Sequence, residues 1–497
     1  MLHDAASLPN NVLVEADTCI IGAGPAGVAL ALALSAAGRQ VALLESGGIG
    51  PEDEPQALNE GMVVGGPYTG LRQTRWRQVG GAAAVWNTWV AGLAYGRMVP
   101  LDAWDFSGWP FALTHLVPWY ERAQRFLGIG RFEYDGGAWS SASRPMLPLG
   151  AGPVVTRIYQ FGRSGLFAEL ADRMRAAPTI HLYQHATAVG LTLDGSGARV
   201  REVSVAGSDR SRFKVRASSV VLAGGAVENA RLLLLAQETG LAPSPFIGSC
   251  FMEHPRDYSA VLEPDSADFA ARMGLYDAHA AIDGTLVCGR LGLAREAVRE
   301  EGIPNASVSF FPRERPRRGL SRLRGWLGGR APTGYGWSTD RDPAHTFDAF
   351  RIVLNLEQAP RRENRVRLGP DRDALGVPGA VLEWSWTAGE QQGLERLRQL
   401  LVETFSRSGI GRLRIVSGSL PDPNAHHHAG TTRMSAGPGE GVVDRECRVH
   451  GTENLFVAGG SVFPSAGFAN PTLTIVALAL RLAAHLSEPS PPYPRTV

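Results

Sequence analysis

Residues 17–27 read DTCIIGAGPAG, and this stretch decides the fold. Its first five residues are mostly apolar or β-branched, as in a buried parallel strand. An Ala- and Leu-rich run follows to about residue 37, and Gly38 then ends the expected helix. Residues 41–45, VALLE, form the next strand. The sequence therefore predicts a strand–turn–helix–strand unit at the start of a parallel sheet.

The turn of this unit carries three glycines at a spacing that suits a dinucleotide. Gly22 allows the tight turn, Gly24 lets the backbone approach a pyrophosphate, and Gly27 lets the helix pack closely on the strand. The first turn of the helix then offers unpaired N–H groups to phosphates. Glu45, at the end of the second strand, is placed to accept from ribose hydroxyls and disfavours a phosphorylated ribose. FAD and NAD both fit this pattern.

The composition is that of an ordinary globular protein. The chain has 497 residues, of which 44% are hydrophobic and 20% charged, with a net charge of +1. This length predicts two to three domains, and the balanced charge predicts neither a nucleic-acid nor an acidic partner. The cysteines, Cys19, Cys250, Cys288 and Cys447, show no CxxC spacing, so we expect no disulfide framework and no zinc site.

Two features of the chain bear on its location. The first 15 residues carry acidic side chains and no continuous apolar core, unlike a secretory signal. The apolar stretches near residues 28–37 and 473–484 are too short or too interrupted to cross a membrane. We therefore expect a soluble, cytoplasmic protein without a transmembrane segment.

Two further glycine-rich stretches occur in the first half of the chain. Residues 65–87 include Gly80 and Gly81 beside small residues, which suits either a backbone lying against a flat ring or a plain flexible loop. Residues 219–225 form an apolar strand that ends in Gly224 and another glycine. A second strand-to-glycine turn of this kind would close over a long cofactor.

Residues from about 180 to 215 predict antiparallel strands, and the region from about 250 to 408 predicts many more. The second region has short strands, prolines and charged turns, and is the natural place for a substrate wall. Within it, residues 313–330 hold seven arginines among leucines and a tryptophan. This segment suits either an amphipathic docking surface or a solvated surface insertion.

Near the C-terminus, three adjacent histidines, His426, His427 and His428, precede Asn470. Three histidines suggest a metal, but in an extended strand His427 would point away from its two neighbours. No further ligand follows at a familiar spacing, so we expect no metal. The other interpretation is a base, His427, with a carboxamide, Asn470, in a redox enzyme that deprotonates its substrate.

The C-terminal motifs resemble those of the glucose–methanol–choline (GMC) oxidoreductases. They are His427-x-x-Gly430-Thr431-x-Arg433-Met434, then NLFVAGGSVFP at residues 454–464 and ANPT at 469–472. The N-terminal fingerprint and the glycine-rich stretches match in family order. The resemblance is closest to pyranose oxidases and bacterial sugar or C-glycoside oxidoreductases, and it is weak between residues 250 and 408.

The resemblance implies a function for individual residues. The catalytic pair would be His427 and Asn470, and the FAD contacts would include Asn87, Gly460, Pro471 and Thr472. Two departures stand out. Val85 occupies the place where some pyranose oxidases carry a histidine joined to FAD, which implies non-covalent FAD. Gly459 stands where many members have an Asp.

The implied fold is α/β, or α+β overall, with a Rossmann-like FAD-binding domain and a mainly antiparallel substrate domain, similar to p-hydroxybenzoate hydroxylase. We expect residues 1–100, 155–249 and 409–490 to form the discontinuous FAD-binding domain. Residues 250–408, with an excursion at 101–154, would form the substrate domain.

The expected reaction is oxidation of a sugar or glycoside hydroxyl, a secondary alcohol becoming a ketone. Neutral imidazole suits the removal of the hydroxyl proton, Asn470 can donate to the substrate oxygen, and the flavin accepts the hydride. Alternatives are a primary alcohol, for example of an aminoglycoside intermediate, a sterol or simple alcohol, a non-catalytic flavin-binding protein and an NAD-dependent dehydrogenase. Oxygen, a quinone or a redox protein would re-oxidise the flavin, and the oligomeric state stays open.

Overall fold

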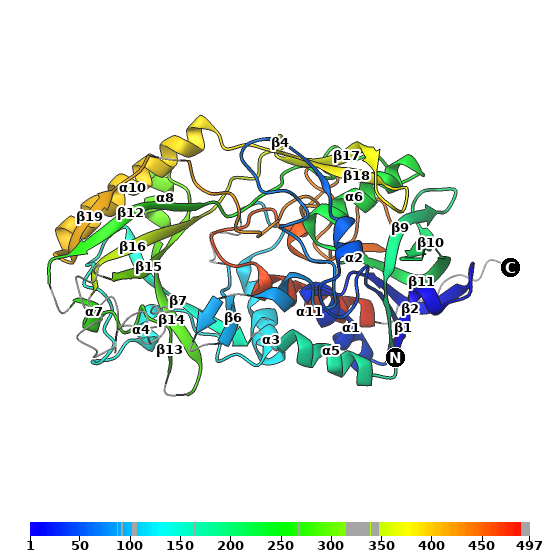
Figure 1. The fold of residues 1–497 in the computed structure, drawn as a ribbon, viewed down its shortest axis with the longest axis horizontal. Helices are drawn as coiled ribbons and strands as arrows, with labels where there is room; N and C mark the ends of the chain where they lie inside the picture. The colour runs from blue at the N-terminus through cyan, green and yellow to red at the C-terminus, as the bar shows by residue number, and fades with distance from the viewer. Residues whose placement is uncertain are drawn as a thin grey trace, which may run out of the picture.

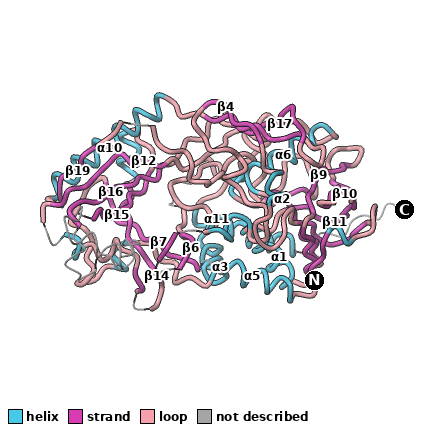
Figure 2. Tube along the Cα trace, in the orientation of Figure 1, coloured by secondary structure: helices cyan, strands magenta, loops and turns pink. Residues whose placement is uncertain are grey.

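The computed structural model describes residues 1–86, 88–90, 93–101, 107–163, 166–209, 211–266, 269–281, 283–314, 338, 347–418 and 420–488. Figure 1 shows an elongated molecule with the long helix α10 (Ala388–Ser408) at one end and the N-terminus toward the other. Figure 2 shows strands at both ends, with helices and long loops between them.

The first sheet has eight strands in the described part of the chain and contains the nucleotide motif. Its order is β1 (Leu2–Asp4), β8 (Ile180–Gln184), β3 (Val41–Leu44), β2 (Leu13–Ile21), β11 (Arg212–Leu222), β10 (Val200–Gly207) and β9 (Ala186–Leu193), and β20 (Leu455–Val457) also pairs with β11. The strands β1, β8, β3, β2, β11 and β20 run parallel, whereas β10 and β9 are antiparallel.

Helices pack against the first sheet through their apolar side chains. On one side α1 (Pro25–Ala36) packs against α11 (Thr472–Ser487) and α5 (Leu166–Ala176), and α3 (Val117–Leu127) packs against α11. The helix α6 (Gly225–Glu238) packs against β9. Pro25 suits the first turn of α1 because its missing N–H has no partner there. The predicted strand–turn–helix–strand unit is confirmed.

The second sheet is antiparallel and has nine strands among the described residues. Its order is β19 (Gly411–Ile415), β12 (Arg256–Pro264), β16 (Phe347–Leu356), β15 (Ala306–Glu314), β14 (Leu286–Leu293), β7 (Val154–Arg163), β6 (Leu93–Met98) and β5 (Thr88–Val90), with β13 (His279–Ala280) paired to β14. Apolar residues of one face form a core with α10, whose first turn is fixed by a capping box of Thr387 and Glu390.

The remaining elements are short. A three-stranded sheet consists of β17 (Arg365–Arg372), β18 (Pro378–Trp384) and β4 (Gly61–Gly65). The short α-helices are α2 (Asp53–Ala57), α4 (Gly136–Trp139), α7 (Phe269–Arg272) and α8 (Arg295–Glu301). The 3₁₀ turns are η1 (Ala5–Ser7), η2 (Gly81–Val85), η3 (Leu113–His115) and η4 (Gly460–Val462).

Strand pairing differs from the expectations in two places. The prediction of antiparallel strands from residue 180 is wrong for β8, which pairs in parallel with β1 and β3. His185, with a φ of 53°, separates β8 from β9, so one apolar run becomes two strands with different partners. The expected domain boundaries place four strands, β5, β6, β7 and β19, in the FAD-binding domain. In the structure these strands hydrogen-bond in the second sheet instead. The sequences of these strands carry no motif that indicates which strand they pair with.

Candidate active site

The N-termini of three helices meet at one cavity of 550 Å³. The first residues of α1, α6 and α11 all line it, and none of these three helices has a side-chain hydrogen bond capping its N-terminus. The first backbone N–H groups of a helix have no partner within the helix, and the helix dipole is positive at this end. The cavity is therefore suited to a ligand that carries negative charge.

The three glycines of the N-terminal turn differ in the space around them. A Cβ atom on Gly27 would lie 1.9 Å from the Gly22 carbonyl oxygen, and one on Gly22 would lie 2.6 Å from the Ala223 oxygen. A Cβ on Gly24 would meet no atom within 4 Å. Gly22 and Gly27 thus keep the strand, turn and helix together, whereas Gly24 leaves open space beside the cavity.

Glu45 lies between the glycine-rich turn and the loop that follows β3. Its two carboxylate oxygens accept from the backbone N–H groups of Ala23 (2.9 Å) and Gly47 (3.0 Å). The side chain is buried but lines the cavity, and burial raises the pKa of Glu45 despite these hydrogen bonds. A carboxylate has further lone pairs, so Glu45 can still accept from a ligand hydroxyl.

The structure brings most of the predicted site residues to this cavity. Those that line it are Gly22, Gly24, Glu45, Gly81, Gly224, His427, Gly460, Asn470, Pro471 and Thr472. Gly80 is buried beside it, and its N–H donates to the Ala23 carbonyl (2.8 Å). Gly27 supports the turn, and Asn87 lies outside the described residues. Val85 and Gly459, the two departures from the family pattern, also line the cavity.

His427 and Asn470 meet at the N-terminus of α11. The Asn470 Nδ2 atom lies 3.0 Å from Nε2 of His427. Burial lowers the pKa of His427 well below its usual 6.5, and His254, Arg256 and Arg97 lower it further. The imidazole is therefore neutral at neutral pH, with its Nε2 atom in the cavity.

His254 faces the other nitrogen of His427, and sequence reasoning did not find it. Its Nδ1 atom lies 2.9 Å from Nδ1 of His427, and its side chain is completely buried. Antiparallel backbone bridges at Met252–Ala429 and Arg256–Asp422 join the segment of His254 to the segment of His427. The imidazole rings of the two histidines therefore face each other. The two histidines are 173 residues apart, so no spacing rule connects them.

Only one of the two facing Nδ1 atoms, of His254 and His427, carries a hydrogen, because a hydrogen bond joins one N–H donor to one lone pair. Burial lowers the pKa of His254 to about 4, so both rings are neutral at neutral pH. The Asn470 amide nitrogen is a donor, so Nε2 of His427 must present its lone pair there. The hydrogen therefore lies on Nδ1 of His427 and points to His254.

Glu253 connects the backbone of His427 to a second polar group. One oxygen accepts from the backbone N–H groups of His427 (2.6 Å) and His254 (3.0 Å), and the other accepts from the Tyr68 hydroxyl (2.9 Å). The Tyr68 oxygen also lies 2.6 Å from Nε2 of His428. Burial raises the pKa of Glu253 to about 7 and lowers that of His428 to about 3.

The three adjacent histidines have separate roles in the fold. His426 takes a φ of 62° and is exposed, so the segment is not the extended strand that we expected. His427 contacts His254 and Asn470, whereas His428 contacts Tyr68. Among the described residues, no group of three or more His, Cys, Asp or Glu side chains could hold a metal ion.

The C-terminal motifs are joined by backbone hydrogen bonds. The N–H groups of Gly430, Thr432 and Met434 donate to the carbonyls of Gly460, Ser461 and Val462. Gly430 has a φ of 88°, and a Cβ there would lie 2.1 Å from the Cys250 oxygen. The spacing of the HxxGTxRM motif thus reflects a close approach between chain segments.

The loop before Asn470 is held by the end of β16 and the residue after it. The Asn355 side chain donates to the Phe468 carbonyl (2.7 Å), and the Gly467 N–H donates to Glu357 (3.0 Å). Burial raises the pKa of Glu357 to about 7. The second sheet therefore positions Asn470, although Asn470 belongs to the segment that leads into α11.

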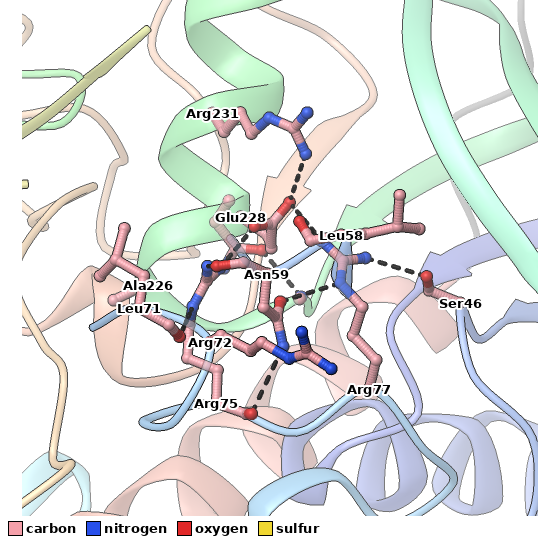
Figure 3. A network of polar contacts seen from close by, with 12 residues as sticks. Ser46, Leu58, Asn59, Leu71, Arg72, Arg75, Arg77, Ala226, Glu228 and Arg231 are labelled. Atoms are coloured by element: carbon pink, nitrogen blue, oxygen red, sulfur yellow. Dashed lines mark hydrogen bonds and ion pairs between the residues drawn. The ribbon is translucent and has the colours of Figure 1, made fainter. Parts of the chain in front are cut away.

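A network of buried charges lines the other part of the cavity (Figure 3). Glu228 of α6 forms ion pairs with Arg75, Arg77 and Arg231. Arg77 also donates to Asn59 (2.8 Å) and to the Ser46 hydroxyl (2.9 Å). Burial alone would raise the pKa of Glu228, but the three guanidinium groups hold it well below its usual range.

The fold and the cavity define a class of protein, and comparison with known families agrees. Residues 17–301 match the family described as FAD dependent oxidoreductase, and residues 360–479 match the family described as GMC oxidoreductase. The chain belongs to the FAD-dependent oxidoreductases. Within this class it is a GMC oxidoreductase, an enzyme that acts on CH–OH groups with FAD as its cofactor. The predicted family, fold class, enzyme class and FAD cofactor are confirmed.

Two named relatives span most of the chain, and a third matches a shorter part of it. The 6‴-hydroxyparomomycin C oxidase of Streptomyces lividus is 25% identical over 95% of this chain and 92% of its own length. The paromamine 6′-oxidase of Streptomyces fradiae is 26% identical over 76% of this chain and 71% of its own. The C-glycoside 3-oxidase of Arthrobacter globiformis is 34% identical over 30% of this chain and 28% of its own.

Solved structures share the fold. Pyridoxine 4-oxidase from Mesorbium loti superposes with a TM-score of 0.55 and 17% identity, over 94% of this chain and 98% of that one. A formate oxidase of Aspergillus oryzae gives a TM-score of 0.56 at 18% identity, over 96% of this chain and 99% of that one. In the part of this chain that is described, no helix is both long and apolar enough to cross a membrane.

Proposed function

We propose that the enzyme oxidises a hydroxyl group of a sugar or glycoside, converting a secondary alcohol into a ketone. The observation that carries the proposal is the contact of 3.0 Å between Nε2 of His427 and Nδ2 of Asn470 inside the cavity. When a hydroxyl group replaces this contact, the Nε2 lone pair can accept its proton and the Asn470 N–H can donate to its oxygen. A flavin-binding protein without activity would need neither.

The residues present suit FAD along the whole cavity. The open space at Gly24 and the N-terminus of α1 would hold the diphosphate, and Glu45 would bind a ribose. Pro471 and Thr472 line the cavity next to Asn470, which contacts His427, and the isoalloxazine would lie there. When bound there, FAD supplies the hydride acceptor. Val85 offers no side-chain atom for a covalent bond, so we propose non-covalent binding.

His427 would act as the base. Its Nε2 lone pair accepts the hydroxyl proton, and the growing alkoxide character of the oxygen helps the carbon to release its hydride. Nδ1–H continues to donate to His254, which keeps the ring oriented while it becomes positively charged. Asn470 would donate from Nδ2 to the substrate oxygen as negative charge develops on it.

The names of several relatives support a carbohydrate substrate. They include C-glycoside 3-oxidases and a pyranose 2-oxidase, although each match spans less than a third of this chain. The relatives named for hydroxyparomomycin and paromamine favour a second candidate, a primary alcohol of an aminoglycoside intermediate. A simple alcohol has support from a relative named 2-methyl-1,2-propanediol dehydrogenase, which is 23% identical over 95% of this chain, whereas none of these names is that of a sterol enzyme.

An anaerobic panel of sugars, glycosides, aminoglycosides and simple alcohols, followed by bleaching of the flavin, tests the proposal. We expect sugars or glycosides to bleach it. His427→Ala should slow bleaching by a factor of roughly 10² to 10⁴ while FAD stays bound, and Asn470→Ala should slow it by roughly 10² to 10³. The exposed His115→Ala is the control. Undiminished reduction in His427→Ala would exclude it as the base.

The mode of FAD binding has its own test. Acid precipitation of the yellow protein should release the flavin into the supernatant, because the proposed site holds it without a covalent bond. Flavin that stays with the precipitated chain would contradict non-covalent binding.

A further inference from the structure

The second sheet turns a polar face toward the cavity. Val287, Leu291 and Leu293 of β14 belong to the core beneath α10, so Arg290, at the intervening position, points to the opposite face. On the neighbouring strand β7, Arg157 lies directly opposite Arg290.

Two further arginines place positive charge in the cavity beside His427, the proposed base. Arg97 of β6 and Arg256 of β12 both line it together with His427. No hydrogen bond or ion pair joins either guanidinium to a described residue, and the Arg97 Nε atom is buried without a partner. Burial, together with the positive charges of Arg290 and Arg256, lowers the pKa of Arg97 to about 10.

The carboxylates nearby are occupied or neutralised. Asp257, next to Arg256, pairs with Arg398 (2.9 Å) and accepts from Ser259. Glu253 and Glu357 accept backbone N–H groups, and both have a pKa raised to about 7. Burying an unpaired charge is costly, so guanidinium groups without a partner in a cavity indicate an anion that arrives with the ligand.

We propose that the substrate is a sugar or glycoside with an anionic group, a carboxylate or a phosphate, that Arg97 and Arg256 bind while His427 faces the reacting hydroxyl. The proposal rests on the function proposed above and narrows it. It disfavours an aminoglycoside, whose ammonium groups would be repelled by the same arginines. Guanidinium groups match carboxylate and phosphate oxygens in geometry as well as charge.

Binding to the oxidised holoenzyme, measured by perturbation of the flavin absorbance, tests the proposal without turnover. The probes are D-glucose, D-glucuronate, D-glucose 6-phosphate and D-glucosamine. We expect glucuronate or glucose 6-phosphate to bind about tenfold more tightly than glucose, with an affinity that falls as salt is added. Which of the two binds better identifies the anionic group.

Single substitutions test whether Arg97 and Arg256 cause the preference for an anionic sugar. Arg97→Gln or Arg256→Gln should remove most of the preference for the anion, and Arg256→Lys should restore part of it. Arg351→Gln is the matched control, since Arg351 lies on β16 of the same sheet but is exposed and does not line the cavity.

The outcomes separate this inference from the proposed function. If both anions bind no more tightly than glucose, or fail to perturb the flavin at all, the inference is wrong. The carbohydrate function still stands if neutral sugars bleach the flavin without oxygen. If only simple alcohols bleach it, the proposed function fails, whatever the anions do.

Discussion

The Nδ1 atom of His254 lies 2.9 Å from the Nδ1 atom of His427, with the two rings nearly perpendicular at 77°. This contact leaves Nε2 of His427, the nitrogen beside Asn470, as the one that can take a proton. His254 does not line the cavity, so it would act as a positioning residue that sets the tautomer of the proposed base.

Replacing His254 by Phe keeps a ring in the buried site but removes the acceptor for Nδ1–H of His427. We expect FAD to stay bound and flavin reduction to slow by roughly 10- to 100-fold, the range found when partners that orient functional histidines are removed. His254→Asn should recover part of the rate, because its carboxamide oxygen can accept. Equal rates in the Phe variant and the wild type, at every pH, would rule out this function.

The rate of flavin reduction should depend on pH only in acid. Burial and the neighbours His254, Arg256 and Arg97 lower the pKa of His427, so its basic form persists well below pH 6.5. Stopped-flow reduction at saturating substrate should therefore be constant across neutral and alkaline pH and decrease in acid. Arg256→Gln removes one positive neighbour and should move this decrease to higher pH. A midpoint at or above pH 6.5 in the wild type would contradict the assignment.

The pH dependence of protein stability should reveal the titration of the buried side chain of Glu253. Its pKa is about 7 in the folded protein, against 4.5 for an ordinary Glu. Between these values the folded protein keeps a proton that the unfolded chain has lost, so this group's contribution to stability decreases as the pH rises. His254, with a pKa of about 4 against 6.5, acts in the opposite direction at lower pH.

Glu253→Gln mimics the protonated acid and removes this titration. Relative to the variant, the wild type should lose on the order of 3 kcal/mol of unfolding free energy between pH 5 and 8. Thermal melts of the holoenzymes across this range measure it. Glu440→Gln, at an exposed position, should show no such trend. A difference in Tm that does not change with pH would show that Glu253 is charged throughout.

The glycines of the N-terminal turn provide a matched pair of variants. Gly24→Ala adds a methyl group where no protein atom lies within 4 Å, so the chain should fold normally but bind FAD weakly. Gly27→Ala places the same group 1.9 Å from the Gly22 oxygen and should destabilise the fold itself, by at least about 1–3 kcal/mol. Circular dichroism and FAD content distinguish the two. Full FAD content in Gly24→Ala would show that the diphosphate does not bind there.

Sequence alone could predict the parts of the site that local motifs define. The strand–turn–helix–strand unit at residues 17–45 follows from apolar runs and glycine spacing, and the structure contains it. His427 and Asn470 were paired through motifs, and the two side chains are in contact. Each of these features depends on residues close together in the chain.

Other features depend on contacts between distant segments, which no spacing encodes. His254 meets His427 only because two backbone bridges align segments 173 residues apart. The signal available was the run of Phe251, Met252, Glu253 and His254, which puts two titratable side chains directly after apolar ones. The left-handed turn at His185 separates the parallel strand β8 from β9. The sequence did not indicate this turn, because no glycine occupies it.

The charged network around Glu228 has a consequence for how the enzyme acquires its flavin. Its members come from Ser46 after β3, from residues 59–77 and from α6, and all of them except Arg231 line the cofactor cavity (Figure 3). These segments meet only in the folded chain, so a site for FAD is complete only after long-range folding. The flavin can therefore bind fully only after residues 59–77 have packed against α6.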